Sequence, residues 1–257
     1  MNLRLLAFVL GEIAVIIGAL MSIPLFMAIG YGEDTTILAF GIAIGVCLLM
    51  GVIGIIVRPP KAKRDMRSTS GFAMCALFWI FIALVSAIPF RVSGYIPNYI
   101  DALFETISGY TTTGSSILTN VEALPKSLLF WRSLTQWIGG LGIVFFTIAL
   151  LPSLVGGQTK VFAAEATGPI KTKLHPRLST SAKWIWSIYL MLTIACIASY
   201  YVAGMNLFDS FNYAMTTTAT GGFSTHNSST SFFHSPALEY ICAFFCFLSG
   251  VNFTLLY

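Results

Sequence analysis

The chain has 257 residues and a net charge of +4, and 56% of its residues are apolar while only 9% are charged. An average soluble domain carries about 25% charged residues, so this chain cannot cover a soluble fold with a charged shell. Intrinsic disorder is excluded as well, because disordered chains are rich in charge and poor in apolar residues. The composition therefore indicates a protein of the lipid bilayer.

Six apolar stretches reach about 20 residues, the length at which a helix crosses a bilayer. In chain order they are Leu5–Ile29, Ile37–Val57, Gly71–Phe90, Ser127–Val155, Trp184–Gly204 and Pro236–Tyr257. Two further segments, Pro97–Asn120 and Asn206–Ser231, are too polar to cross lipid and too apolar for ordinary loops. Such backbone is tolerated at membrane depth only where protein buries it or where it lines a watery cavity. We therefore expect each segment to be a long external loop or a re-entrant hairpin.

The basic residues predict the orientation, because Lys and Arg in short loops stay on the cytoplasmic side. A cytoplasmic N-terminus places 11 of the 14 basic residues inside, ten of them in the loop that begins at Arg58 and in the loop that follows Val155. We interpret these clusters as topology signals, with anionic lipid or a cytosolic subunit as the alternative contact. No nucleic-acid partner is expected.

The two polar segments resemble each other, which indicates an internal repeat. Aligning Gly114 with Gly221 also pairs threonines in the two segments. The spans that follow match as well, since QWIGGLGI begins at Gln136 and CFLSGVNF begins at Cys246. The repeated unit is therefore a span, a short amphipathic helix, a Thr/Gly segment and a second span.

Each unit contains a half-helix, predicted at Tyr99–Tyr110 and at Leu207–Thr217, that ends at a Thr/Gly segment. The C-terminal carbonyls of a helix carry about half a negative charge, which favours a cation. The first Thr/Gly segment (Thr111–Ser115) and the second (Thr218–Gly222) can present successive carbonyl oxygens, with threonine hydroxyls as further ligands, because glycine permits backbone angles that a Cβ would block. Neither segment contains an acidic residue. Neutral oxygen ligands suit a monovalent cation that must bind and leave.

Three sequence motifs of this chain resemble those of a known family. TTTGSS, TATGGFSTHNSS and LPKSLLFWRSLTQWIGGLGI are similar to the TrkH and KtrB family of potassium-uptake membrane proteins, and the similarity covers essentially the whole chain. The resemblance implies four repeats around one pore with one key glycine in each filter. Carried onto this sequence, the glycines are Gly114 and Gly221, and the ion-binding carbonyls are those of Thr112, Thr113, Ala219 and Thr220, with Thr111, Ser115, Thr218 and Gly222 flanking them.

The resemblance also implies a homodimer in the inner membrane and a cytosolic, nucleotide-binding regulatory subunit similar to TrkA. Two of the four repeats are present, so the chain looks like the N-terminal half of such a protein. The function implied is potassium uptake through a carbonyl-lined filter, with no enzymatic activity and no cofactor. The alternative is a secondary transporter whose half-helices hold another cation or a small solute, although the shared orientation of the two units argues against inverted repeats.

We therefore expect an all-α integral membrane protein with two span–pore-helix–filter–span repeats, preceded by two extra transmembrane helices, which forms half of a pseudo-fourfold, channel-like pore. The expected parts are a two-helix segment with a basic loop (residues 1–70), the first repeat (71–157), a cytoplasmic linker (158–183) and the second repeat (184–257).

Several polar residues outside the Thr/Gly segments are expected to have structural roles. Glu105 can attract cations at the outer mouth or pair with Arg132, and we favour the pairing. Asp209 is interpreted as a helix N-terminal charge. His226 and His234 have no Cys or acidic residue near them in the sequence, so we interpret them as loop residues rather than metal ligands.

Overall fold

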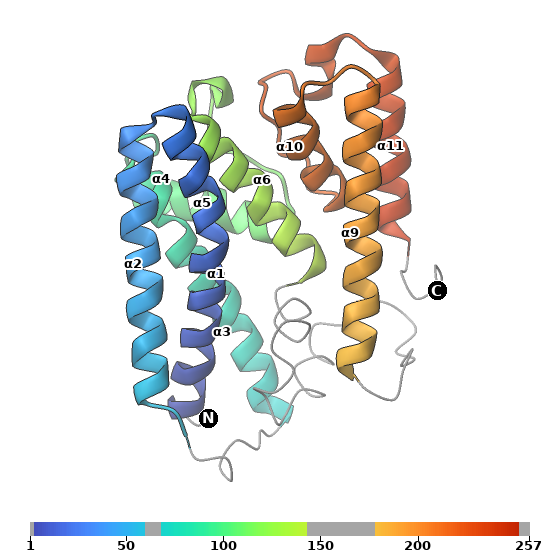
Figure 1. Cartoon of the computed structure of the whole chain (residues 1–257). Coiled ribbons are helices and arrows are strands. Elements are labelled where there is room, and N and C mark those ends of the chain that lie inside the picture. The colour runs from blue at the N-terminus through green and yellow to red at the C-terminus, as the bar shows by residue number, and fades with distance from the viewer. Residues whose placement is uncertain (1–2, 60–67, 143–177, 252–257) are drawn as a thin grey trace. The chain divides into compact units, whose positions relative to one another are not determined.

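A computed structural model describes residues 3–59, 68–142 and 178–251, and within these ranges the chain is helical with no strand. The elements, shown in Figure 1, are α1 (Leu3–Tyr31), α2 (Asp34–Ile56), α3 (Ser68–Ser86), α4 (Ile88–Val92), α5 (Tyr99–Tyr110), η2 (Val121–Ala123), α6 (Lys126–Leu141), α9 (Leu178–Val202), α10 (Leu207–Thr218), η3 (Ser229–Phe233) and α11 (Pro236–Gly250). They form two compact units. The first contains α1 to α4 and most of α5, and the second contains the end of α5, most of α6, and α9 to α11.

In the first unit, α1 and α2 pack closely through small residues. A Cβ added at Gly11 would come within 2.9 Å of the Gly54 Cα, and one added at Gly18 would come within 2.9 Å of the Cys47 Cβ. Lipid tails are as apolar as the side chains, so helices in a bilayer associate through close van der Waals packing. The glycines permit that approach.

The third predicted span is interrupted near its end. α3 stops at Ser86, and α4 follows with Pro89 in its first turn. Proline lacks the backbone N–H that an uninterrupted helix needs and is tolerated at a helix start. Two hydroxyls of α5 donate to α3 carbonyls, Tyr99 to Leu84 at 2.6 Å and Thr106 to Ala83 at 3.1 Å. The end of α3 therefore supports the first half-helix.

The connection between α1 and α2 caps α6. The Glu33 carboxylate accepts the backbone N–H of Lys126 at 2.9 Å and that of Ser127 at 3.3 Å, and it also accepts the Ser127 hydroxyl. A carboxylate satisfies the free N–H groups of a helix start and complements the helix dipole. Glu33 thus ties the two extra N-terminal helices to the start of α6.

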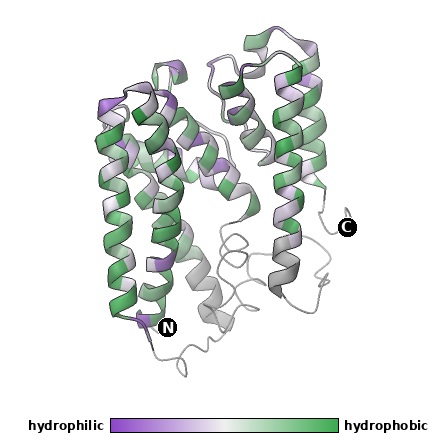
Figure 2. Cartoon of the chain, in the orientation of Figure 1, coloured by the Kyte–Doolittle hydropathy of each residue, from purple (hydrophilic) through white to green (hydrophobic). Residues whose placement is uncertain are grey.

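Three helical stretches are long and apolar enough to cross a bilayer, namely Leu3–Tyr31, Asp34–Ile56 and Trp184–Val202, and Ala76–Val92 and Pro236–Gly250 are shorter apolar stretches. Figure 2 shows apolar residues along most of α1, α2 and α11. α6 ends at Leu141, where Gly142 has a φ of +72° and can close the helix, before the predicted span reaches Val155. Residues 143–155, the basic loop at 60–67, the linker up to residue 177 and residues 252–257 lie outside the described residues.

In the second unit, α9, α10 and α11 share a core built on two tyrosines. Tyr200 and Tyr213 are buried, with ring centroids 6.4 Å apart in an edge-to-face arrangement. The other buried members are Cys196, Met205, Ala214, Leu238 and Phe245. This core holds the second half-helix against the spans on either side of it.

Candidate functional site

The two half-helices begin in the same way. Asn98 accepts the backbone N–H of Ile100 at 3.0 Å, and Asn206 accepts that of Asp209 at 2.9 Å. Both α5 and α10 are 12 residues long with an aspartate in the first turn, Asp101 and Asp209. When Asn98 is paired with Asn206 and Asp101 with Asp209, the second repeat lies one position away from where the alignment of Gly114 with Gly221 places it. That alignment is therefore out of register for the half-helices.

The first half-helix ends in a Schellman motif, in which the chain turns back on the last helical carbonyls. The N–H of Thr112 donates to Gly109 O at 2.9 Å, and the N–H of Thr113 donates to Ser108 O at 3.0 Å. Thr112 has a φ of +53° and Gly114 a φ of +77°.

The second half-helix ends in the same motif. The N–H of Thr220 donates to Thr217 O at 3.0 Å, and the N–H of Gly221 donates to Thr216 O at 2.9 Å. Thr220 has a φ of +54° and Gly222 a φ of +84°. The motif shows the same one-position shift as the helix starts, so the backbone counterpart of Gly114 is Gly222 rather than Gly221.

The left-handed position of each motif holds threonine where glycine is usual. Thr112 and Thr220 have φ values of +53° and +54°, and a β-branched residue in this region is a genuine outlier. Backbone strain of this kind clusters at functional sites, where the surrounding structure maintains it. Finding it at equivalent places in two repeats marks both turns as built features.

The two Thr/Gly segments lie against each other. A Cβ added at Gly114 would overlap the carbonyl oxygen of Gly221, so the two backbones touch at these residues. In the first segment Thr111, Thr113 and Ser115 are exposed, while Thr112 and Gly114 are half-buried. In the second segment Thr220 and Gly222 are exposed, while Thr218, Ala219 and Gly221 are buried. The structure thus brings the predicted residues of both repeats to one place.

The hydroxyls of the two repeats have different surroundings. Thr111 and Thr113 form a hydrogen bond with each other at 2.7 Å on the exposed side. Thr218 donates to Ala214 O at 2.8 Å and bonds to the Thr193 hydroxyl of α9 at 3.2 Å. The buried Thr218 hydroxyl therefore joins α10 to α9.

One side of α6 packs against the end of the first half-helix. A Cβ added at Gly109 would come within 3.2 Å of the Thr135 Cβ, and one added at Gly139 would come within 2.7 Å of the Tyr110 carbonyl carbon. Residues 135 and 139 are four apart and share one helix face. Glycine at 109 and 139 allows the two helices to meet at backbone distance.

The neighbouring side of α6 faces the second segment and the loop after it. Arg132 is buried, donates to Ser224 O at 3.1 Å and to the Ser116 hydroxyl at 3.3 Å, and covers the Phe223 ring at 4.2 Å. One turn further, the Gln136 Oε1 accepts the backbone N–H of Phe223 at 3.1 Å. Sequence reasoning missed both contacts. The available signal was a guanidinium and an amide at i and i+4 of one predicted span.

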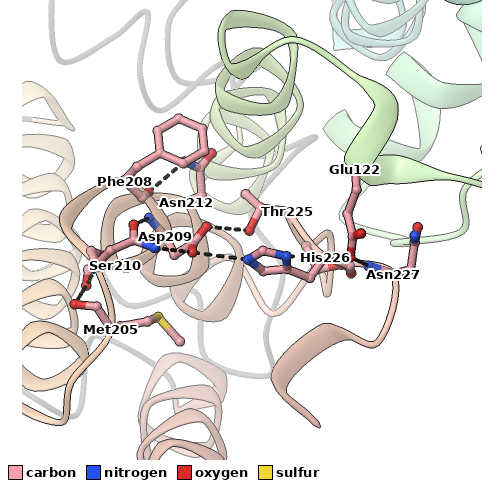
Figure 3. A network of polar contacts seen from close by, with 11 residues as sticks. Glu122, Met205, Phe208, Asp209, Ser210, Asn212, Thr225, His226 and Asn227 are labelled. Atoms are coloured by element: carbon pink, nitrogen blue, oxygen red, sulfur yellow. Dashed lines mark hydrogen bonds and ion pairs between the residues drawn. The ribbon is translucent and has the colours of Figure 1, made fainter. Parts of the chain in front are cut away.

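A polar network joins the loops that follow the two segments (Figure 3). The Asp209 carboxylate accepts the Thr225 hydroxyl at 2.6 Å and lies 3.1 Å from His226 Nε2. On its other side, His226 Nδ1 lies 3.6 Å from Glu122, which also accepts the backbone N–H of Asn227 at 3.1 Å. The network therefore holds η2 of the first repeat to the N-terminus of α10.

These contacts correct one expectation and leave another open. His226 lies in a loop as expected, but the fold brings two acidic residues to it that are distant in the sequence, so the expectation that it is a lone histidine is wrong. In the described part of the chain, no group of three His, Cys, Asp or Glu side chains is placed to hold a metal ion. The pairing of Glu105 with Arg132 stays a prediction.

Comparison with known proteins decides the family. The sequence profile of TrkH, described as cation transport protein, matches residues 44–257. The chain belongs to the TrkH family. Trk system potassium uptake protein TrkH from Halomonas elongata is 36% identical over 99% of this chain, and the protein of the same name from Escherichia coli K12 is 38% identical over 99%.

A solved TrkH structure shares the fold. The crystal structure of the potassium transporter TrkH from Vibrio parahaemolyticus matches with a TM-score of 0.82 at 33% identity, and the match covers 100% of this chain and 51% of that one. The chain covers 53% of each of the two relatives from Halomonas and Escherichia, so it spans about half their length. The predicted all-α membrane fold and the family resemblance are confirmed.

Proposed function

We propose that this chain supplies two of the repeats that line the ion path of a potassium-uptake protein of the Trk type. The observation that carries the proposal is the pair of Schellman-ended half-helices whose Thr/Gly segments touch at Gly114 and Gly221. The TrkH relatives are named as potassium uptake proteins, and the two half-helices with their Thr/Gly segments are the features of this chain that support the proposal.

The proposed ligands are backbone oxygens. These oxygens would replace the hydration shell of a passing ion. They belong to Thr112, Thr113 and Gly114 in the first segment and to Ala219, Thr220 and Gly221 in the second, with Gly222 beside them. The left-handed threonines support this role, because a residue with positive φ at this position ends the helix and changes the course of the backbone. The C-terminal ends of two helix dipoles add partial negative charge there.

We also propose that the N-terminus is cytoplasmic, that the protein crosses the inner membrane several times, and that two further repeats complete a pseudo-fourfold pore. The distribution of basic residues supports the orientation. A homodimer and a cytosolic regulatory subunit similar to TrkA are proposed from the family, since the relatives are named as parts of a Trk system.

The test is rubidium uptake by bacterial cells that lack their own potassium-uptake systems and express the complete gene of this protein. We expect growth at low external potassium and uptake of ⁸⁶Rb⁺ that excess K⁺ abolishes and equal Na⁺ does not. Uptake of a solute coupled to Na⁺ or H⁺, with no effect of K⁺, would favour the secondary transporter instead and would remove this proposal.

A further inference from the structure

One side chain packs against the second Thr/Gly segment and lies close to the first. Gln136 lies on α6 and is fully buried. A Cβ added at Gly221 would come within 2.7 Å of the Gln136 Nε2, and one added at Gly114 would come within 3.8 Å of the same atom. The carboxamide therefore fills the space behind Gly221 and reaches the edge of Gly114.

The two ends of this carboxamide have different partners. Oε1 accepts the N–H of Phe223 at 3.1 Å, which fixes the backbone just after the second segment. Among the described residues, Nε2 has no hydrogen-bond partner although it is buried. A buried amide with an unpaired donor is destabilising, so an amide here needs a reason beyond packing. An apolar residue of the same size would avoid that cost.

The location supplies the reason. Gln136 belongs to the span of the first repeat, whereas the backbone it holds belongs to the second. Four residues earlier on the same helix face, Arg132 binds the loops after both segments. The side of α6 that carries Arg132 and Gln136 belongs to the first repeat and thus holds the backbone of the second repeat in place.

We propose that Gln136 is a positioning residue for ion selectivity, which holds the second Thr/Gly segment at a fixed distance from the first. This inference rests on the proposed function. Selectivity between K⁺ and Na⁺ depends on the spacing and number of oxygens around the ion. Releasing Phe223 would let the Gly221 and Gly222 backbone relax, and the smaller Na⁺ would then be accepted more easily.

Three variants of the complete protein separate this role from simple packing. Gln136→Met keeps the length of the side chain and removes the acceptor. Gln136→Glu keeps an acceptor oxygen for Phe223. Ser133→Ala is the matched control, because this buried hydroxyl on α6 donates to Leu129 O of its own helix at 3.2 Å.

Two measurements are made on each variant. Amide hydrogen exchange of the peptide that contains residues 219–225 reports the backbone directly and does not depend on transport. The Rb⁺/Na⁺ preference of uptake reports selectivity. For Gln136→Met we expect Phe223 to exchange faster and the Rb⁺/Na⁺ preference to fall, each by roughly tenfold, as expected when one buried donor loses its acceptor. Gln136→Glu should retain most of the exchange protection, and Ser133→Ala should match the wild type in both measurements.

The outcomes are distinct. Wild-type exchange and preference in Gln136→Met would overturn the inference, and so would a loss of protection in Gln136→Glu as large as that in Gln136→Met. If Gln136→Met accumulates poorly, retained protection in Gln136→Glu supports the inference, and lost protection overturns it. If the variants show the expected exchange changes but the wild-type protein takes up no rubidium, the proposed function is removed, while the role of Gln136 in holding the backbone stands.

Discussion

The two repeats share a backbone and differ in what surrounds it. Both half-helices start at an asparagine cap and end at a left-handed threonine, and these features hold equivalent positions in the two repeats. The first Thr/Gly segment is mostly exposed, with hydroxyls that bond to each other. The second is packed against α6 and α9. The difference shows that the turn geometry is what the repeats have in common, while the side chains that hold it vary.

The N-terminal ends of the half-helices differ in the same way. Asp209 is 4% exposed and binds Thr225 and His226, whereas Asp101 at the equivalent position is half-buried. The contacts of Asp209 join the start of α10 to the loop after the second Thr/Gly segment. Because Asp209 is buried and has these partners, we expect substitutions at the start of the second half-helix to cost more stability than equivalent ones in the first.

The largest expected effect comes from the glycines with positive φ. Gly114→Ser and Gly222→Ser should each lower the Rb⁺/Na⁺ preference roughly tenfold or more, because a left-handed side chain costs about 1–2 kcal/mol. Gly114→Ser should be the more severe, since its Cβ also overlaps the Gly221 carbonyl. The measurement is competition uptake with the complete protein.

The control for this pair is Gly204→Ser, where φ is +102° and nothing lies within 4 Å of an added Cβ. It should strain the backbone and leave the ion preference unchanged. If Gly221→Ser changed selectivity and Gly222→Ser did not, Gly221 and not Gly222 would be the functional counterpart of Gly114. That result would contradict the equivalence drawn from the backbone angles.

A smaller effect is expected from the buried hydroxyl of the second repeat. Thr218→Val removes the bonds to Ala214 and Thr193 and should lower the free energy of unfolding by about 1 kcal/mol. Thr113→Val, on the exposed first segment, should change it by less than about 0.5 kcal/mol. Thermal unfolding of the two variants in the same detergent makes the comparison. Equal losses would show that the two segments are held equally.

The smallest difference is expected at the caps. Asn206→Ala should cost about 1 kcal/mol, because Asn206 both accepts from the Asp209 N–H and donates to the Asp209 carboxylate at 2.6 Å. Asn98→Ala removes one bond to Ile100 and should cost about half as much. Hydrogen exchange in the first turn of each half-helix measures both. A greater loss at Asn98 would reverse the proposed order of stability.

Much of this architecture follows from the sequence, because span length, charge and repetition are local signals. The half-helix at Tyr99–Tyr110 was predicted with its observed bounds, and the second was one residue short. The register error came from aligning glycines, whereas the Asn-x-x-Asp caps at Asn98 and Asn206 carry the true spacing. Dihedral angles decide which glycine is equivalent, and these are not visible in a sequence.

The remaining features depend on contacts between distant parts of the chain. His226 looks isolated in sequence, yet the fold brings Asp209 and Glu122 to it. Gln136 was part of a matched motif, but its partner Phe223 is 87 residues away. Pro89 lies at the break between α3 and α4, but Pro24 lies inside α1 without ending it, so a proline in an apolar stretch does not by itself predict where a span is interrupted.

The central claim is that backbone oxygens of the two Thr/Gly segments hold a dehydrated alkali ion. It is tested most directly by a structure of the complete protein, purified in RbCl, with anomalous scattering recorded at the rubidium edge. We predict an anomalous peak beside both segments, within coordination distance of carbonyl oxygens from residues 111–114 and 219–222. A well-ordered structure with both turns resolved and rubidium bound elsewhere, or with the ion held by side-chain carboxylates, would contradict the claim.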